Sequence, residues 1–459
     1  IFFRVATTVG KHKMLREMVP MPLAASDPEE EVDPTTPSET SKKPKSWQLW
    51  WESQVKGSPA LGAFNIICCV VGVGLLGLPY AMSQSGWIGV PLLVVTCAMA
   101  TYTCVIMGAA MQATPGATSF GDLGQAAYGP MGKWMVAVQQ YMTMIGVAAI
   151  FLVVLASGLK QVAPETFPSC NSNITTVGLF VCFHIFFHKL NEVAILSAFN
   201  LVVAVLITVV VSYQSVLARP ATSNTVLFNT QYDGSYNYQF LIAFPTIAFA
   251  FGCHTIIPAV YEELKDKNTY SKMCYVSMPI TLLMYLPVAV IGYWAFGDKV
   301  QDPIFKNFDS AAVNVVVVLL LAHVVMSYAI IMNPPELAFE DQVVDCIKVR
   351  SSSALQKALV GNRWPLRLVL RLCLTGLTVF IAKAVPCFPV LLSLVSSVTG
   401  TTTSFIFPVL FYLRLVKEMP SSHRTICRVI LLFATIGGVT GTYNAILGMK
   451  ECHLSNTGC

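Results

Sequence analysis

The chain of 459 residues is 55% hydrophobic and only 12% charged. Soluble globular domains carry about 25% charged residues, so this composition excludes an ordinary soluble protein and predicts an all-α protein that crosses a membrane several times. The net charge of +5 does not indicate nucleic-acid binding, because the basic residues lie between apolar segments rather than in one patch. Most of the 14 cysteines lie inside apolar segments, and no pair has the sequence spacing of metal ligands.

The first 57 residues are polar. Residues 24–45 are rich in Pro, Ser, Thr and acidic residues, a composition typical of disorder. We therefore expect residues 1–57 to form a disordered tail and residues 58–459 to form the transmembrane domain. Ser58 and Pro59 are well suited to begin the first helix, as an N-cap residue and a proline in the first helical position.

Eleven apolar segments are long enough to be considered as membrane spans. They are predicted at about 60–82, 87–111, 134–159, 174–188, 192–217, 239–262, 273–296, 309–333, 366–383, 387–412 and 426–448.

Basic residues predict the orientation of these spans, because cytoplasmic loops are enriched in Lys and Arg. With the N-terminus in the cytoplasm, 23 of the 29 basic residues lie on the inner side and 6 on the outer side. We therefore expect a cytoplasmic N-terminus, in either a plasma membrane or a vacuolar or vesicular membrane. This orientation places Cys170, Cys452 and Cys459 outside, where Cys170 could pair with one of the two C-terminal cysteines or all three could remain free thiols.

The first span contains an unusual concentration of helix-breaking residues. Gly72, Gly74 and Gly77 lie within six residues and are followed by Pro79. Glycine and proline favour an interruption at residues 71–74, and in lipid such a break is tolerated only where its polar groups face protein or water. The alternative is that these glycines only let another helix pack closely.

A second span, five spans later, has the same character. Its midpoint is the segment 250–254, with Gly252 and His254, and Pro258 follows. Paired interrupted spans in corresponding halves indicate the substrate site of a transporter built from inverted repeats, here about 58–217 and 239–412 with an additional helix at 426–448.

Such breaks offer two kinds of binding group. The N–H groups near Val71 and Gly74 begin a half-helix and are suited to a carboxylate. The carbonyl groups of Val70 and of residues 249–252 are suited to an ammonium group or a cation. These two poles together favour a zwitterionic amino acid, and the apolar residues near the breaks, including Phe249, Phe251, Leu75 and Tyr141, favour a neutral one.

The motifs GLLGLPYA (residues 74–81) and FAFGCHTIIPAVYEEL (residues 249–264) resemble the amino acid/auxin permease family of the amino acid–polyamine–organocation superfamily. The resemblance covers about residues 58–448 and implies a leucine-transporter-like fold of about 11 helices in a 5+5 inverted repeat, with helices 1 and 6 broken. It also implies secondary active transport of amino acids, driven by H⁺ or Na⁺. Carried over by position, the family's binding spans contain Asn65, Gly72, Gly74, Leu75, Phe249, Gly252 and His254. Cys253 departs from the small residue that many relatives have there.

Three residues are candidates for ion coupling. His254 could relay protons, since an intramembrane histidine titrates in the physiological range, or it could remain neutral and bond a freed carbonyl. His323 and Ser327 lie one helical turn apart. In the implied fold this span faces span one, so Ser327 could ligate Na⁺; both residues could instead only bond neighbouring helices. The acidic residues at the inner span ends are expected to pair with Lys265 or the basic loops: Glu262, Glu263, Glu336 and Glu340.

Other classes of membrane protein lack support in the sequence. It contains no GxxxxGK[ST] phosphate-binding loop, no filter motif of a channel, and neither HExxH nor GxSxG. We therefore expect no enzyme activity and no cofactor besides the coupling ion, with an amino acid and the lipid bilayer as partners and the oligomeric state open. The serious alternative is an amino acid sensor that signals through the N-terminal tail.

Overall fold

The computed structural model describes residues 57–186, 193–218, 223–229, 239–350 and 363–455. Throughout these residues the chain forms helices and their connections, with no strand, which confirms the all-α class. Residues 1–56, which hold almost all of the predicted tail, lie outside them. The helices are α3 (Pro59–Val70), α4 (Gly74–Ser85), α5 (Gly89–Gln112), α6 (Phe120–Val162), α7 (Cys170–Val181), α8 (Val193–Leu217), α9 (Gln239–Ala250), α10 (Ile257–Glu263), α11 (Tyr270–Phe296), α12 (Ala311–Arg350), α14 (Trp364–Ala384), α15 (Phe388–Val395), α16 (Phe407–Leu415) and α17 (Ser421–Ser455).

Each predicted span coincides with at least one of these helices, although their lengths differ from the prediction. Nine helical segments among the described residues are long and apolar enough to cross a membrane. The number is lower than eleven because α3 and α7 have only 12 residues each and because α4 and α5 form one continuous segment. By contrast, α12 is longer than predicted: it continues to Arg350, well past the predicted end at 333, although it contains Pro334 and Pro335.

The first helix begins as its sequence predicts. The side chain of Ser58 accepts a hydrogen bond from the Leu61 amide, and Pro59 occupies the first turn, where its missing N–H is not needed. Span ten differs from an ordinary helix: between α15 and α16 the chain forms two π-helical segments, Ser396–Gly400 and Thr402–Ile406. Such wide turns occur mostly as local bulges and are often found at functional sites.

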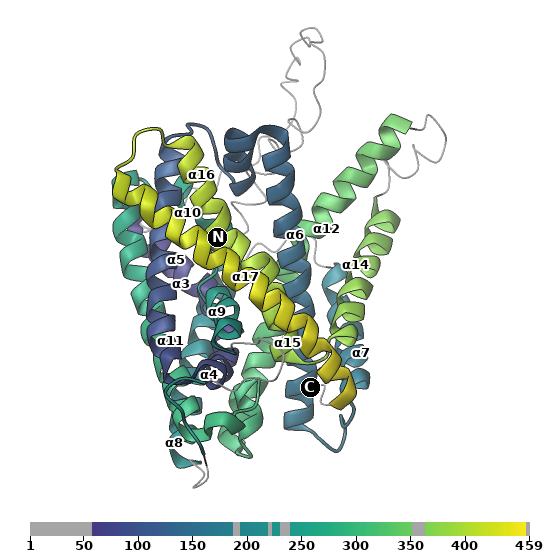
Figure 1. Ribbon diagram of the computed structural model, residues 1–459. Coiled ribbons are helices and arrows are strands. Elements are labelled where there is room, and N and C mark those ends of the chain that lie inside the picture. The colour runs from purple at the N-terminus through teal and green to yellow at the C-terminus, as the bar shows by residue number, and fades with distance from the viewer. Residues whose placement is uncertain (1–56, 187–192, 219–222, 230–238, 351–362, 456–459) are drawn as a thin grey trace, which may run out of the picture.

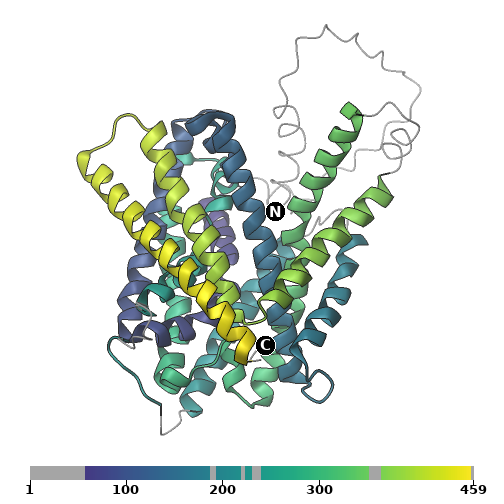
Figure 2. The ribbon, with the colours of Figure 1, turned by 45° about the vertical axis from the view of Figure 1, so that its right-hand side comes forward.

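The two broken spans, formed by α3–α4 and α9–α10, are surrounded by the longer helices (Figure 1). Helix α11 packs against α3, α4, α5 and α8, whereas α12 packs mainly against α6 and α8. Helix α17 crosses α9 and α15 obliquely in Figure 1, and Figure 2 shows the same helix from another side. The breaks lie in the first and sixth spans, as the predicted 5+5 repeat requires.

A disulfide joins Cys387 at the start of α15 to Cys452 near the end of α17. The predicted option of a Cys170–Cys452 bond is therefore wrong, because the fold brings the end of α17 to α15 instead. Cys170 is also disulfide-bonded. Cys459, the other predicted candidate, lies outside the described residues.

Candidate functional site

The first break occurs where the sequence predicts it. Helix α3 ends at Val70, α4 begins at Gly74, and residues 71–73 are not helical. The amide of Val71 still donates to the Ile67 carbonyl, and the amides of Leu75 and Leu76 donate to Gly72 and Val73. Between them, the amides of Gly72, Val73 and Gly74 donate to no residue that the structure describes. These three N–H groups lie at the start of a half-helix, where a negative charge is favoured.

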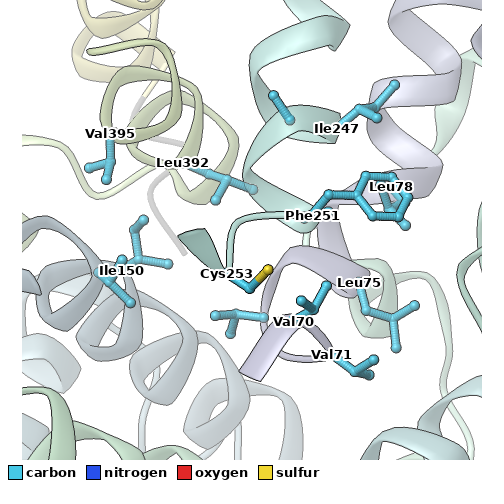
Figure 3. Close-up of a cluster of buried hydrophobic side chains, with 14 of the residues drawn as sticks. Val70, Val71, Leu75, Leu78, Ile150, Ile247, Phe251, Cys253, Leu392 and Val395 are labelled. Atoms are coloured by element: carbon cyan, nitrogen blue, oxygen red, sulfur yellow. The ribbon is translucent and has the colours of Figure 1, made fainter. Parts of the chain in front are cut away.

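The second break lies directly against the first. Helix α9 ends at Ala250, and a short 3₁₀ turn from His254 to Ile256 leads into α10. A methyl group added to Gly74 would lie 3.0 Å from the Ala250 Cα atom, so the two broken spans are in contact at this glycine. In Figure 3, Val70, Val71 and Leu75 of the first span lie beside Phe251 and Cys253 of the second.

Part of this junction is accessible despite lying in the middle of the spans. Cys69 and Gly252 are exposed, and Gly72 and Phe249 are half-buried. A methyl group on Gly72 would meet no atom within 4 Å. The first break therefore borders open space at Gly72, whereas Gly74 packs against Ala250.

Two side chains that the sequence analysis did not single out bind the carbonyl groups of the breaks. The Tyr285 hydroxyl, from α11, lies 2.7 Å from both the Val70 and the Ala250 carbonyl oxygens. Asn200, from α8, donates to the carbonyls of Cys68 at 2.8 Å and Val71 at 3.1 Å. The Val70 and Ala250 carbonyls thus each have the Tyr285 hydroxyl within hydrogen-bond distance, and their predicted role of receiving an ammonium group or a cation stays a prediction. No local sequence pattern marks either residue.

The remaining candidates in the broken spans are buried. Asn65 lies within α3, well before the break, and is 4% exposed. Val71 and Leu75 are both fully buried, and so is Phe251, so these three contribute to the packing beneath the junction. Tyr141, also named for its aromatic ring, packs against Phe339 of α12 instead. Phe249 and Tyr141 are both half-buried, and of these two Phe249 lies in the second broken span.

His254 lies at the second break and points toward α5. Its Nε2 atom is 2.8 Å from the Thr103 hydroxyl and 3.3 Å from the Cys104 sulfur, and the residue is 1% exposed. Its Nδ1 atom has no hydrogen-bond partner among the described residues. His254 is thus a buried imidazole that joins the break to the second span.

His323 and Ser327 both lie on α12. Their side chains contact each other on α12, with the Ser327 hydroxyl 3.1 Å from His323 Nε2. The main contacts of α12 are with α6 and α8, and the expectation that span eight faces span one stays a prediction. Helix α8 packs against α12, which forms the eighth span, and also against α3, the first half of the first span.

The comparisons with known proteins decide the family. Residues 56–447 match the family described as "Transmembrane amino acid transporter protein". The chain belongs to this family. Amino acid transporter AVT1D of Arabidopsis thaliana is 24% identical over 400 residues, which cover 84% of this chain and 68% of that protein. Amino acid transporter AVT3B of the same plant is 28% identical over 417 residues, covering 85% and 94%.

Membership in this family confirms amino acid transport as the function and shows that the protein is not an enzyme. Among solved structures, a mutant of the Eremococcus coleocola manganese transporter is 13% identical, with a TM-score of 0.44 over 90% of this chain and 98% of that one. That likeness is too low to bear on function.

The transporter has a buried charged cluster at the predicted inner side. Glu336 of α12 lies 2.6 Å from His184 and 3.2 Å from Arg371 of α14, and all three side chains are at most 4% exposed. One turn away, Glu340 pairs with Arg367 at 3.0 Å. Glu262 pairs with Lys267 at 3.7 Å on the surface. The inner glutamates were predicted to pair with Lys265 or the basic loops: Glu262 does pair with a loop lysine, whereas Glu336 and Glu340 pair with arginines inside α14.

The transporter also buries an acid in the loop between α11 and α12. Asp302 is 8% exposed, and neither carboxylate oxygen has a hydrogen-bond partner among the described residues. The carboxylate faces Gly77 of α4, where an added methyl group would lie 3.6 Å from Oδ2. Burial raises the pKa of Asp302 well above its ordinary value, and the charge of Lys306 opposes this shift. Burial also lowers the pKa of Lys306 to about 8.

Replacing Asp302 with asparagine is expected to stabilise the transporter at neutral pH. The pKa of Asp302 is higher in the folded than in the unfolded state. Below about pH 4 the carboxyl group is protonated in both states, so it costs no stability. As the pH rises through the folded pKa, that stability is lost. We expect Asp302→Asn to raise the apparent Tm at pH 7.5 by about 2–4 °C, with the difference disappearing toward pH 4. Thermal unfolding in detergent across this pH range measures both effects.

The control is Asp309→Asn, at an exposed position in the same loop, which should change neither the apparent Tm nor its pH dependence. A lower Tm for Asp302→Asn at pH 7.5 would contradict the burial of an unpaired carboxyl.

Proposed function

We propose that the protein is a secondary active transporter of neutral amino acids, coupled to a proton or sodium gradient, with alternating access around a site between the two breaks. The observation that carries this proposal is the set of amides at Gly72, Val73 and Gly74, which lack partners among the described residues, in a break that borders open space at Gly72. The substrate carboxylate binds these amides. The transporter lies in a plasma membrane or a vacuolar or vesicular membrane with its N-terminus in the cytoplasm, an orientation that the basic residues support.

The preference for neutral substrates rests on the residues available at the junction. Segments 69–74 and 249–256 contain no Asp, Glu, Lys or Arg. A cationic or anionic side chain would enter this region without a countercharge, which is unfavourable in a poorly hydrated environment. The half-buried ring of Phe249 offers an apolar surface to the substrate side chain instead.

The coupling residue is proposed from burial and position. His254 is an ionisable side chain at the second break, and it hydrogen-bonds Thr103 of the second span, so its protonation would change how these two segments hold together. This supports proton coupling through His254. For sodium coupling, His323 and Ser327 remain the candidates; their hydroxyl and imidazole groups lie together on α12, and Ser327 is half-buried.

The test is amino acid uptake into proteoliposomes with pH and Na⁺ gradients imposed separately and a metal chelator present. Uptake driven by the pH gradient should be lost in His254→Ala and retained in Ser327→Ala if protons couple through His254. The reverse pattern under a Na⁺ gradient would assign coupling to α12. Binding of the amino acid without accumulation under either gradient would overturn the transport mechanism and favour a sensor, whose output should then depend on residues 1–57.

A further inference from the structure

Two thiols and an imidazole converge between α5 and the second break. The sulfur atoms of Cys104 and Cys253 and the Nε2 atom of His254 lie within 4.8 Å of one another. The two sulfurs are 3.6 Å apart, and the Cys104 sulfur is 3.3 Å from His254 Nε2. All three residues are at most 1% exposed. In the part of the chain that the structure describes, no other group of three such side chains comes this close.

The two shortest of these distances are close to those between the ligands of a tetrahedral zinc ion, and the third is at most 4.8 Å. With Zn–S bonds of about 2.3 Å and Zn–N bonds of about 2.0–2.1 Å, neighbouring sulfurs lie about 3.8 Å apart and a sulfur and a nitrogen about 3.6 Å apart. The observed separations of 3.6 and 3.3 Å are only slightly shorter. An ion can therefore be seated among the three atoms by small movements of the side chains.

The charge and softness of the ligands identify the class of ion. Thiolate and imidazole ligands favour Zn²⁺ and similar soft ions over Mg²⁺, Ca²⁺ or Na⁺, which prefer oxygen. Two thiolates and a neutral imidazole balance the charge of one Zn²⁺, so the occupied site is neutral and suited to a buried position. Each ion that binds displaces the two thiol protons. The fourth position is left to a water molecule or to the Thr103 hydroxyl, which lies 2.8 Å from His254 Nε2.

We propose that Cys104, Cys253 and His254 bind one Zn²⁺ or a similar soft divalent ion. The ion joins α5 to the segment that connects α9 with α10, and thereby fixes the second break. The site does not include the amides of the first break, but it shares His254 with the proposed proton relay, so zinc binding is measured directly rather than through transport.

Metal binding to the purified full-length protein tests the proposal. After reduction and removal of metal with a chelator, we expect about one Zn²⁺ per chain by equilibrium dialysis and the release of about two protons per ion. Cys104→Ala and Cys253→Ala should each weaken binding by more than about 100-fold, since loss of even a partner that only orients a ligand costs 10–100-fold. Cys97→Ala is the matched control: Cys97 is also buried on α5, but its sulfur contacts the Met278 carbonyl instead.

A spectroscopic measurement on the unmodified protein keeps the proposal testable if a variant fails to fold. Co²⁺ in place of Zn²⁺ should give thiolate-to-metal charge-transfer absorption in the wild type and in Cys97→Ala, and none in Cys104→Ala. Absence of this absorption in the wild type, or unchanged zinc binding in Cys104→Ala, would overturn the proposal. So would a Cys104–Cys253 disulfide that forms readily in metal-free protein and is unaffected by added Zn²⁺, because the pair would then serve as a redox couple.

Discussion

Replacing Glu336 with alanine is expected to lower the free energy of unfolding by about 3–5 kcal/mol, because it removes the carboxylate paired with the buried Arg371 side chain. The Arg371 side chain is 1% exposed and lies 3.2 Å from Glu336, and the same carboxylate contacts His184 at 2.6 Å. The three residues join η3 (Cys182–Phe186), α12 and α14, so their loss should loosen three helices together. The apparent Tm in detergent and the yield of monodisperse protein measure the effect.

Glu262→Ala is the matched control for this prediction. Its pair with Lys267 has side chains that are 36–40% exposed, and exposed ion pairs contribute at most about 1 kcal/mol. The double variant Glu336→Ala/Arg371→Ala should be less destabilised than Glu336→Ala alone, because it removes the buried arginine as well. If Glu336→Ala and Glu262→Ala lowered the Tm equally, the buried cluster would not carry the stability that its geometry indicates.

Replacing Gly74 with valine is expected to reduce transport by at least about tenfold, the loss that corresponds to about 1.4 kcal/mol. The added Cβ atom would lie 3.0 Å from the Ala250 Cα atom and 3.2 Å from its Cβ atom, so the two broken spans would be forced apart. Overpacking of this kind also costs about 1–3 kcal/mol of stability. Uptake into proteoliposomes and the apparent Tm measure the two losses separately.

The variant Gly72→Ala tests the proposed binding site without disturbing the close contact between the two broken spans at Gly74. A methyl group there would contact nothing within 4 Å, so the apparent Tm should stay close to that of the wild type. Because the added methyl group would occupy the open space beside the Gly72 amide, where the substrate carboxylate is proposed to bind, the variant should still weaken substrate binding. Equal loss of Tm in Gly72→Ala and Gly74→Val would show that the space at Gly72 is not open in the working protein.

Much of the fold was predictable because membrane spans are encoded locally. A long apolar segment must form a helix to satisfy its backbone in lipid, and Gly or Pro in its middle is tolerated only for a reason. The positions of both breaks, at residues 71–73 and just after Ala250, could therefore be predicted from single stretches of sequence. The Ser58 cap and the Pro59 start are equally local.

The partners of these local features could not be predicted in the same way. Tyr285 is 215 residues from Val70 in the sequence, yet its hydroxyl bonds that carbonyl. Similarly, Cys104 meets Cys253 and His254 across about 150 residues, so sequence spacing gave no sign of a metal-binding group. The packing of α12 mainly on α6 and α8 likewise depends on contacts between helices that are far apart in the sequence.

The sequence alone thus determined the membrane class, the approximate spans, the two interruptions and the transporter family, because each depends on composition and on short motifs. The tertiary structure alone decided which carbonyls are already satisfied, where the first break borders open space, which cysteines pair and which charges are buried together. The physical reason is that these properties depend on contacts between helices far apart in the chain, and such contacts follow from the packing of whole helices rather than from any local pattern of residues.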